Sequence, residues 1–297
     1  MALAGVLSAL RTFILDENNF PSTVSERIES YRSRFPGLSS DEVEDLAAIP
    51  PEKIKIYTTS IFSSQRKVLR NKFPMTFGYI ERYYQNDLKQ PFRATIFMRD
   101  QHKHRPWRSN YTVELVDNFC AYLSEDRQDL KLAIPWLEDV VAFEKSASRI
   151  HRASDDTYTI RQSLTASGLT NLTVGDFLSL DFFIPHFNHF ARFKFDIPRV
   201  FHNFVRENRT IPKEMPLQRE TFAAAGRNRY LNARWTRLSE SEFDYLSKIP
   251  KSERIPISDF ADAFVTWSDD DETVGFQKFF GLVARLNEIG GIILLGA

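Results

Sequence analysis

The stretch FNHFARFKFDIPRVFHNFVREN, Phe187 to Asn208, decides the fold class because its apolar pattern changes in the middle. Every second residue from His189 to Phe195 would lie on one face of a β-strand, with mainly charged residues on the other. Pro198 then suits the first turn of a helix, and the residues after it return to helical spacing. A strand followed at once by a helix predicts an α+β fold.

The region before this stretch is expected to be helical. Residues 1–153 carry apolar residues at helical spacing, interrupted by prolines and polar breaks. Ser39 or Ser40 is expected to cap a helix that ends before Pro50, and Pro74 to begin a helix that continues to about Asn86. Further helices are expected within 61–73, 92–99 and 113–123, and from 135 onward. We therefore predict an N-terminal all-helical domain over 1–153.

The remainder, residues 154–297, is expected to form a smaller winged-helix-like α/β module. Ser239 and Glu242 have the spacing of a capping box, and helices are expected over 238–249, 257–264 and 271–291. We expect a loop over 211–226 because it bears prolines. Strands are expected in DDTYTIRQS (155–163), LTNLTVGD (169–176), RNRYLNARWT (227–236) and IILLG (292–296).

Charge and cysteine content restrict the classes of partner. The chain has 39 basic and 39 acidic residues, so it lacks the bulk attraction that most nucleic-acid and anionic-membrane binders show. Basic residues nevertheless concentrate between Arg66 and Arg108. The single cysteine, Cys120, excludes an intrachain disulfide and is compatible with a reducing cytoplasm. We expect its thiol to be buried in the core rather than to act as a nucleophile.

The N-terminal segment MALAGVLSALRTFIL is expected to be an amphipathic helix. It lacks a basic first region and a small-residue cleavage site, and Arg11 interrupts its apolar run, unlike a secretory signal. No apolar stretch approaches the length of a membrane span. A cytoplasmic chain with no membrane partner is therefore expected.

The sequence contains none of the strong catalytic motifs: no GxGxxG, no Walker loop, no GxSxG and no HExxH. Two histidine pairs remain, His102 with His104 and His186 with His189. A pair alone is under-coordinated, although Asp181 near the second pair would complete a set of two histidines and one carboxylate. We expect no catalytic residue and no metal ligand in this chain.

Two carboxylate features have structural explanations. The acidic run SDDDET, Ser268 to Thr273, lacks the ligand spacing and glycine of a calcium loop and is better explained as the capped first turn of a helix. Glu144 lies on the apolar stripe of its helix. Either a paired carboxylate between helices or an interface residue would account for it.

The helical half resembles the HvfC/BufC N-terminal domain family over about residues 50–155. The resemblance is carried by IYTTSIFSSQRKVLRNKFPMTFGYI, FMRDQHKHRPWRSNYTVELVDNFCAYL and IPWLEDVVAFEKSASRIHRA. The family shows a Tyr-led helix ending in Phe-Pro, a His- and Pro-containing loop, a helix ending in Tyr-Leu, and a last helix opening with Pro-x-Leu. The matching positions are Tyr57, Phe73, Pro74, Pro106, Tyr122, Leu123, Pro135, Leu137 and Glu144.

The second half resembles the C-terminal module of methanobactin-type partner subunits, through IPHFNHFARFKFDIPRVFHNF and RYLNARWTRLSESEFDYLSKI. The resemblance implies a non-catalytic subunit, without a cofactor of its own, in a heterodimer with a TIM-barrel multinuclear iron oxidative enzyme. In such systems the partner helps to capture a ribosomally made precursor peptide, and the iron belongs to the barrel. The long N-terminal leader and the acidic WSDDDET segment depart from that pattern.

Binding by strand addition gives candidate site residues. An exposed strand edge accepts an extended peptide through backbone hydrogen bonds. The predicted peptide-binding set is Ile292, Ile293, Leu294 and Leu295 as the edge, with Lys278 and Arg285 as the polar groups. The helix face of Phe276, Phe279, Phe280, Val283 and Leu286 would then floor a groove, or would simply be core. The predicted partner interface is His102, His104, Arg105, Trp107 and Arg108.

Two other functions compete with this hypothesis. Winged-helix modules often bind DNA, and the segment 66–108 supplies basic residues; the net charge of zero argues against a nucleic-acid partner. A free-standing metalloenzyme would have to use His186, His189 and Asp181. Bound metal in the purified chain would distinguish this metalloenzyme from a peptide-recognition subunit and from a DNA-binding protein.

Overall fold

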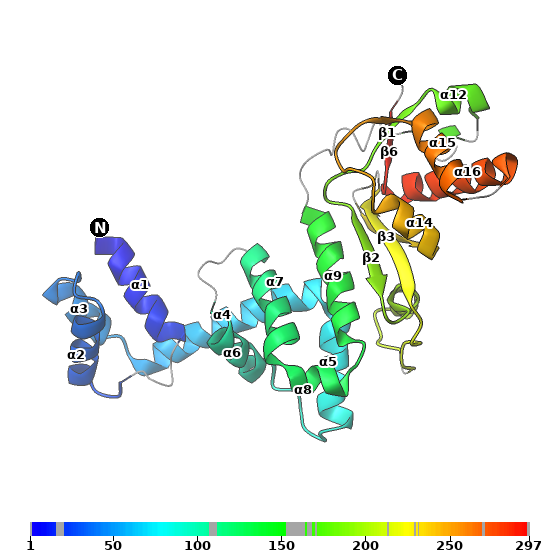
Figure 1. Ribbon diagram of the computed structural model, residues 1–297. Helices are drawn as coiled ribbons and strands as arrows, with labels where there is room; N and C mark the ends of the chain where they lie inside the picture. The colour runs from blue at the N-terminus through cyan, green and yellow to red at the C-terminus, as the bar shows by residue number, and fades with distance from the viewer. Residues whose placement is uncertain are drawn as a thin grey trace. The chain divides into compact units, whose positions relative to one another are not determined.

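The computed structural model describes residues 2–15, 21–106, 112–152, 164, 168–169, 171–212, 214–228, 230, 232–268 and 271–295. It confirms the α+β fold class: the N-terminal region is helical and two three-stranded antiparallel sheets follow (Figure 1). The chain divides into two compact units, the first with residues 1–71 and 93–119, the second with 72–92 and 120–297. The boundary at residue 153 and the winged-helix-like arrangement stay predictions.

Three short helices open the first unit: α1 (Ala2–Leu15), α2 (Val24–Arg34) and α3 (Ser40–Ala47). They share a small core that contains Ala9, Tyr31, Val43, Leu46 and Ala47. Capping boxes at Thr23 and Ser39 fix where α2 and α3 begin, which confirms Ser39 as a cap. The amphipathic first helix is confirmed as well.

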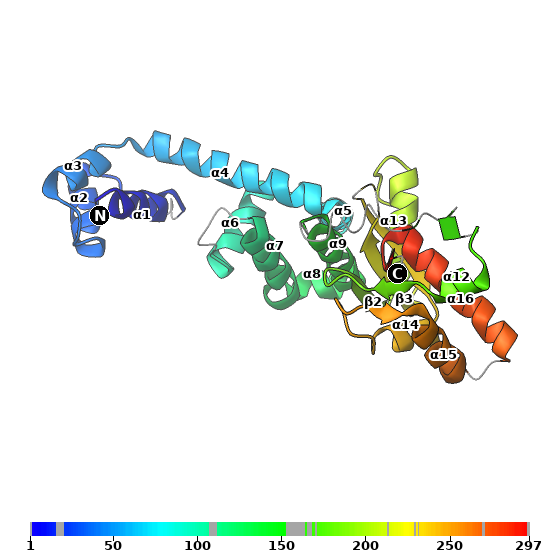
Figure 2. The ribbon, with the colours of Figure 1, turned by 90° about the horizontal axis from the view of Figure 1, so that it is seen from above.

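The rest of the first unit is built from α4 (Pro51–Lys72), α6 (Ala94–His104) and most of α7 (Thr112–Ala121). Figure 2 shows α4 as a long straight helix. Phe62 of α4 is 1% exposed and makes an edge contact with His102 of α6, with ring centroids 6.1 Å apart. The helix expected over 92–99 therefore continues further than predicted, to His104.

In the second unit, α5 (Pro74–Asn86) packs against α9 (Leu137–Arg152). Pro74 lies in the first turn of α5, as predicted, because a missing N–H costs nothing there. The helix predicted to start at Pro135 is α9, which starts two residues later, at Leu137. A π-helical turn, η2 (Tyr122–Asp126), and the short helix α8 (Gln128–Ala133) precede α9 and were not expected.

The first sheet has the order β5-β1-β6, with β1 (Asp181–Phe183) at its centre and β5 (Ile255–Pro256) and β6 (Ile293–Leu295) at its edges. Both neighbours pair with β1 antiparallel, and Phe182 lies opposite Ile255 and Leu294. The predicted strand near the C-terminus is therefore confirmed as an edge strand.

The second sheet has the order β2-β3-β4, from β2 (His189–Phe193), β3 (Thr221–Arg227) and β4 (Ala233–Leu238). The helix α13 (Ile197–Arg206) follows β2, with proline in its first turn as predicted. The loop expected over 211–226 is wrong in its second part, because β3 is the central strand. The fully buried Ala223 and Ala225 give one face of β3 a flat surface against which α9 packs, while Ala224 on the other face belongs to the core of the C-terminal helices.

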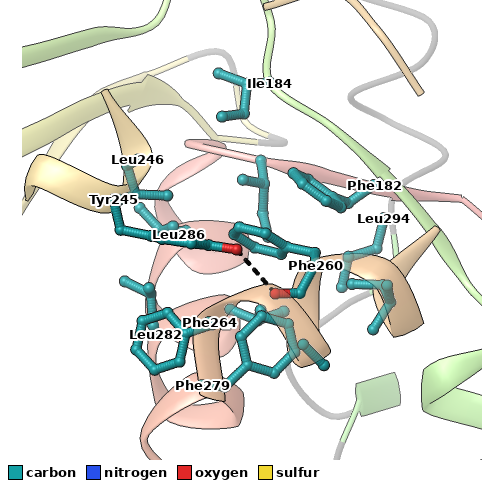
Figure 3. Packing of buried hydrophobic residues seen from close by; sticks show 14 of the residues in the cluster. Phe182, Ile184, Tyr245, Leu246, Phe260, Phe264, Phe279, Leu282, Leu286 and Leu294 are labelled. Atoms are coloured by element: carbon teal, nitrogen blue, oxygen red, sulfur yellow. Dashed lines mark hydrogen bonds between the residues drawn. The ribbon is translucent and has the colours of Figure 1, made fainter. Parts of the chain in front are cut away.

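Four helices cover the sheets in the C-terminal part: α12 (Val174–Leu178), α14 (Glu240–Leu246), α15 (Ile257–Ser268) and α16 (Glu272–Ile289). Their core is aromatic (Figure 3): Phe182 and Phe260 stack with ring centroids 4.2 Å apart, and Phe279 packs edge-on to Phe260. The hydroxyl of Tyr245 donates to the carbonyl of Phe260 at 2.9 Å, so this buried phenol is satisfied.

Two strand predictions in this part need correction. LTNLTVGD does not form a strand: a capping box at Thr173 with Asp176 begins α12 inside it. In RNRYLNARWT only Ala233 to Thr236 belongs to β4, and Arg227 ends β3. DDTYTIRQS lies outside the described residues. Among the helices that the structure describes, none has the length and hydropathy of a membrane span.

Candidate functional site

A groove of about 830 Å³ runs between α13 and the edge strand β4 in the second unit. The helix contributes Pro198, Arg199, Phe201, His202 and Val205, and the strand with its preceding turn contributes Asn232 to Arg237. Phe143 and His151 of α9 complete the lining. The groove is thus bounded by one helix, one strand edge and one end of a second helix.

The strand wall of the groove is an unpaired sheet edge. β4 pairs with β3 on one side only, from Phe222 opposite Leu238 to Arg227 opposite Ala233. Within the described part of the chain, no backbone outside the sheet hydrogen-bonds to residues 233–238. An edge of this kind presents N–H and C=O groups that another chain can pair with.

Aromatic rings form the floor. Phe143 of α9 and Trp235 of β4 stack with centroids 4.2 Å apart and an interplanar angle of 20°. The ring of Phe201 on α13 is tilted by 49° against Phe143, with centroids 4.9 Å apart. Packed rings held by three elements give a rigid apolar surface, which suits an apolar side chain of a ligand.

A buried carboxylate fixes the end of the helix wall. Asp196 is 4% exposed and caps α13 by accepting a hydrogen bond from the N–H of Arg199 at 3.3 Å. Both its oxygens also accept from the guanidinium of Arg237 on β4. This ion pair, in which one guanidinium nitrogen donates to both carboxylate oxygens, ties the first turn of α13 to the strand edge and so sets the width of the groove there.

The lining is basic and contains no acidic side chain in the described residues. Arg237 is neutralised by Asp196, whereas the guanidiniums of Arg199 and Arg234 have no carboxylate partner within the described part of the chain. Burial lowers the pKa of His151, and the cations Lys72 and Arg227 lower it further, so His151 is neutral near pH 7. The available positive charge is therefore that of the two arginines.

The residues predicted to bind a peptide lie elsewhere, at β6 and α16. The side chains of Ile292, Ile293 and Leu294 are 0%, 1% and 0% exposed, so they belong to the core, and Leu295 is half-buried. Lys278 is exposed, and Arg285 forms an ion pair with Glu242 of α14 at 2.5 Å. Only the backbone edge of β6 remains for a peptide, and this three-residue site stays a prediction.

The helix face beside β6 is core, which was one of its two predicted readings. Phe279, Val283 and Leu286 are fully buried within the aromatic cluster, while Phe276 and Phe280 are partly buried against it. These side chains pack on Phe177 and on the rings of α15. They leave no apolar floor for a ligand at that place.

The predicted partner-interface residues fall at the end of α6 in the first unit. His102 and His104 lie in the last helical turn, not in a loop, and Arg105 is the C-cap residue. Burial lowers the pKa of His102 to about 4, with a smaller effect from Arg11, so this imidazole is neutral at pH 7. His104 lies 3.6 Å from the carboxylate of Asp100. Trp107 and Arg108 lie outside the described residues.

The metal-ligand candidates are not brought together. Asp181 begins β1, His186 is exposed in the turn that follows, and His189 begins β2 in the other sheet. Within the described residues, no group of three His, Cys, Asp or Glu side chains has the geometry of a metal site. The set of two histidines and one carboxylate therefore does not form a metal site within the described residues.

The remaining carboxylate and thiol predictions have clear outcomes. Glu144 is 2% exposed and accepts hydrogen bonds from the first turn of α5. Of the two alternatives, it is therefore the carboxylate paired between helices. In the acidic run, Asp271 caps α16 as predicted; Asp269 and Asp270 are outside the described residues. Cys120 is buried, as expected.

Comparisons with known proteins give no family. No family model matches the sequence, and no curated protein matches it at a significant level. The resemblance to the HvfC/BufC family therefore stays a prediction.

Sequence reasoning missed this groove because its parts are distant along the chain. Arg199 and Arg234 are separated by a strand that the sequence did not predict, and Phe143 comes from the helical half. One signal was available: RWTR, Arg234 to Arg237, combines two residues typical of strands, Trp and Thr, with two basic residues, and charged side chains are common on exposed edge strands.

Proposed function

We propose that this chain is a non-catalytic, cytoplasmic partner subunit that binds an extended precursor peptide and presents it to a TIM-barrel multinuclear iron oxidative enzyme. The groove between α13 and β4 is the observation that supports peptide binding. The family resemblance supports the identity of the partner and the ribosomal origin of the peptide. In this proposal the iron belongs to the barrel.

Strand addition is the binding mode that fits the groove. The edge of β4 offers six residues, from Ala233 to Leu238, and an extended peptide of that length would lie beside them. The wall of α13 keeps the peptide against the edge, and the partly exposed ring of Trp235, backed by the buried ring of Phe143, accepts an apolar side chain of the peptide. Backbone pairing supplies affinity, while the aromatic floor and the arginines Arg199 and Arg234 at the rim of the groove supply selectivity.

The partner surface is proposed to include His102, His104 and Arg105. The last turn of α6 exposes His104 and partly exposes Arg105. Both lie in the first unit, so peptide capture and enzyme binding would use different units of the chain.

The proposal is tested by co-expressing the full chain with the iron enzyme and the small peptide encoded beside its gene. We expect a heterodimer, iron in the barrel subunit and less than a tenth of an equivalent in this chain alone. A peptide that is N-methylated at alternate residues should bind at least tenfold more weakly than the same unmethylated peptide, because it lacks donors for the strand edge.

Each competing function gives a different result in the same experiment. Stoichiometric iron and oxidase activity in the isolated chain would establish a metalloenzyme. Micromolar binding to duplex DNA, weakening with salt as several phosphate contacts require, would establish the DNA-binding alternative.

A further inference from the structure

The rim of the groove, formed by Arg199 and Arg234, carries a local excess of positive charge, because no acidic side chain of the described residues lines the groove. The chain as a whole has a net charge of zero. Arg192, another exposed arginine of the second unit, has a carboxylate partner, Glu220 at 2.6 Å. Arg199 and Arg234 are both exposed and have none in the described residues, although they line the same groove.

The two arginines lie on different walls. Arg199 is in the first turn of α13, and Arg234 is on β4, next to Trp235 of the floor. Neighbouring residues of a strand point to opposite faces, so a peptide paired with β4 presents neighbouring side chains to the two faces in turn. Two adjacent acidic residues would then direct one carboxylate toward each wall.

We propose that the groove selects an extended peptide segment with paired Asp or Glu residues beside an apolar residue. The carboxylates bind the guanidiniums of Arg199 and Arg234, and the apolar side chain packs on Trp235 and Phe201. Arginine suits this role because its planar fork binds a carboxylate through two parallel hydrogen bonds. This inference rests on the proposed function and adds the chemical class of the peptide.

Single-stranded nucleic acid is the other polyanion that a basic, aromatic groove attracts. It requires aromatic faces on which bases stack. One face of Trp235 is already covered by Phe143, and the groove contains an unpaired strand edge that bases do not use. The observations therefore favour an acidic peptide.

The test uses the full chain and three fluorescein-labelled octapeptides. The acidic probe is Val-Glu-Glu-Phe-Val-Glu-Glu-Val; in the neutral and basic probes, glutamine or lysine replaces every glutamate. Fluorescence anisotropy at about 0.1 M salt should give at least tenfold tighter binding of the acidic than of the neutral probe, equivalent to about 1.4 kcal/mol. The basic probe should bind more weakly than either.

Variants connect the preference to the two arginines. The double variant Arg199→Gln/Arg234→Gln should bind the acidic and neutral probes equally. Arg206→Gln is the matched control, because Arg206 is an exposed arginine on the same helix that does not line the groove. The double variant Arg199→Glu/Arg234→Glu should reverse the preference toward the basic probe. Circular dichroism confirms that each variant is folded.

The outcomes separate this inference from the proposed function. Equal affinity of the wild type for the acidic and neutral probes overturns the acidic preference while leaving peptide binding intact. Failure of all three probes, with tight binding of a dodecamer of deoxythymidine, overturns both. An acidic preference that survives in the Arg199→Gln/Arg234→Gln variant also overturns the inference, because other cations would then carry it.

Discussion

Glu144 accepts two hydrogen bonds from Thr76, one from its backbone N–H at 3.0 Å and one from its hydroxyl at 2.7 Å. A third comes from the N–H of Met75 at 2.8 Å. The carboxylate of α9 thus caps the first turn of α5, where N–H groups have no partner within the helix. This contact joins α5 to α9, the helix that packs against β3 and β4.

Replacing Glu144 with alanine should destabilise the second unit by about 3 kcal/mol. The change leaves three buried donors without an acceptor, and each unsatisfied buried group costs about 1–3 kcal/mol. Urea unfolding followed by tryptophan fluorescence measures the loss. Glu138→Ala is the control: Glu138 is a half-exposed neighbour on α9, and its loss should cost under about 1 kcal/mol. Similar effects of the two variants would contradict the capping role.

The same residue should make stability depend on pH. Burial raises the pKa of Glu144 to about 7 from its usual 4.5, although its hydrogen bonds act in the opposite direction. A carboxyl with a raised pKa in the folded state stabilises the fold fully below 4.5, and this contribution is lost as pH rises through 7. The Glu144→Gln variant lacks this ionisable group, so its stability does not depend on pH through residue 144.

The difference in unfolding free energy between Glu144→Gln and the wild type should therefore shift in favour of the variant between pH 4.5 and 7. Urea unfolding at four or five pH values within this window measures it. Parallel pH profiles for the two proteins would show that Glu144 does not titrate there.

A close backbone contact between Gly226 and Gly290 should tolerate no side chain. Gly290 has φ of +70°, and a Cβ there would lie 2.0 Å from the carbonyl oxygen of Arg227. A Cβ at Gly226 would lie 2.4 Å from the carbonyl carbon of Gly290. Asn188 donates to the carbonyls of Gly290 and Gly291 at 2.9 and 2.7 Å, which holds the end of α16 in this position.

Gly226→Ala and Gly290→Ala should each lower the unfolding free energy by about 2–3 kcal/mol, because backbone atoms must move apart. The double variant should cost less than the sum, since both changes open the same contact. Gly37→Ala, with no atom near the added methyl group, should change stability by less than about 0.5 kcal/mol. Chemical unfolding of the four variants and the wild type checks this; full additivity would argue against a shared contact.

Local signals predicted the ends of elements better than the order of strands in the sheets. The capping box at Ser239 and the prolines at the starts of α5 and α13 act within one turn, so the sequence alone identifies them. The end of α16 at Gly290 is of the same kind.

The central strand β3 has no such signal. Alanines at its middle favour helix by propensity, and pairing with β2 and β4 on both sides overrides this preference. The candidate groove depends on that strand, because β3 places β4 at the edge beside α13. The sequence contains Arg199 and Arg234 as two of many arginines, but only the strand order of the sheet brings them to the same groove.

Asp196 gives a last prediction, which separates helix capping from charge in the groove. Asparagine caps helices about as well as aspartate, so Asp196→Asn should keep α13 folded. It removes the carboxylate that neutralises Arg237, whose side chain is 51% exposed and remains hydrated. The acidic octapeptide should then bind two- to fivefold more tightly, while stability falls by about 1 kcal/mol through loss of the ion pair.

Anisotropy titration and urea unfolding on the same preparation measure both effects of Asp196→Asn. The neutral octapeptide is the control, because its affinity should not change when only the charge of the rim changes. Weaker binding of the acidic peptide, with α13 intact by circular dichroism, would mean that the Asp196 to Arg237 pair shapes the groove. A change in rim charge would then not explain the effect of the variant.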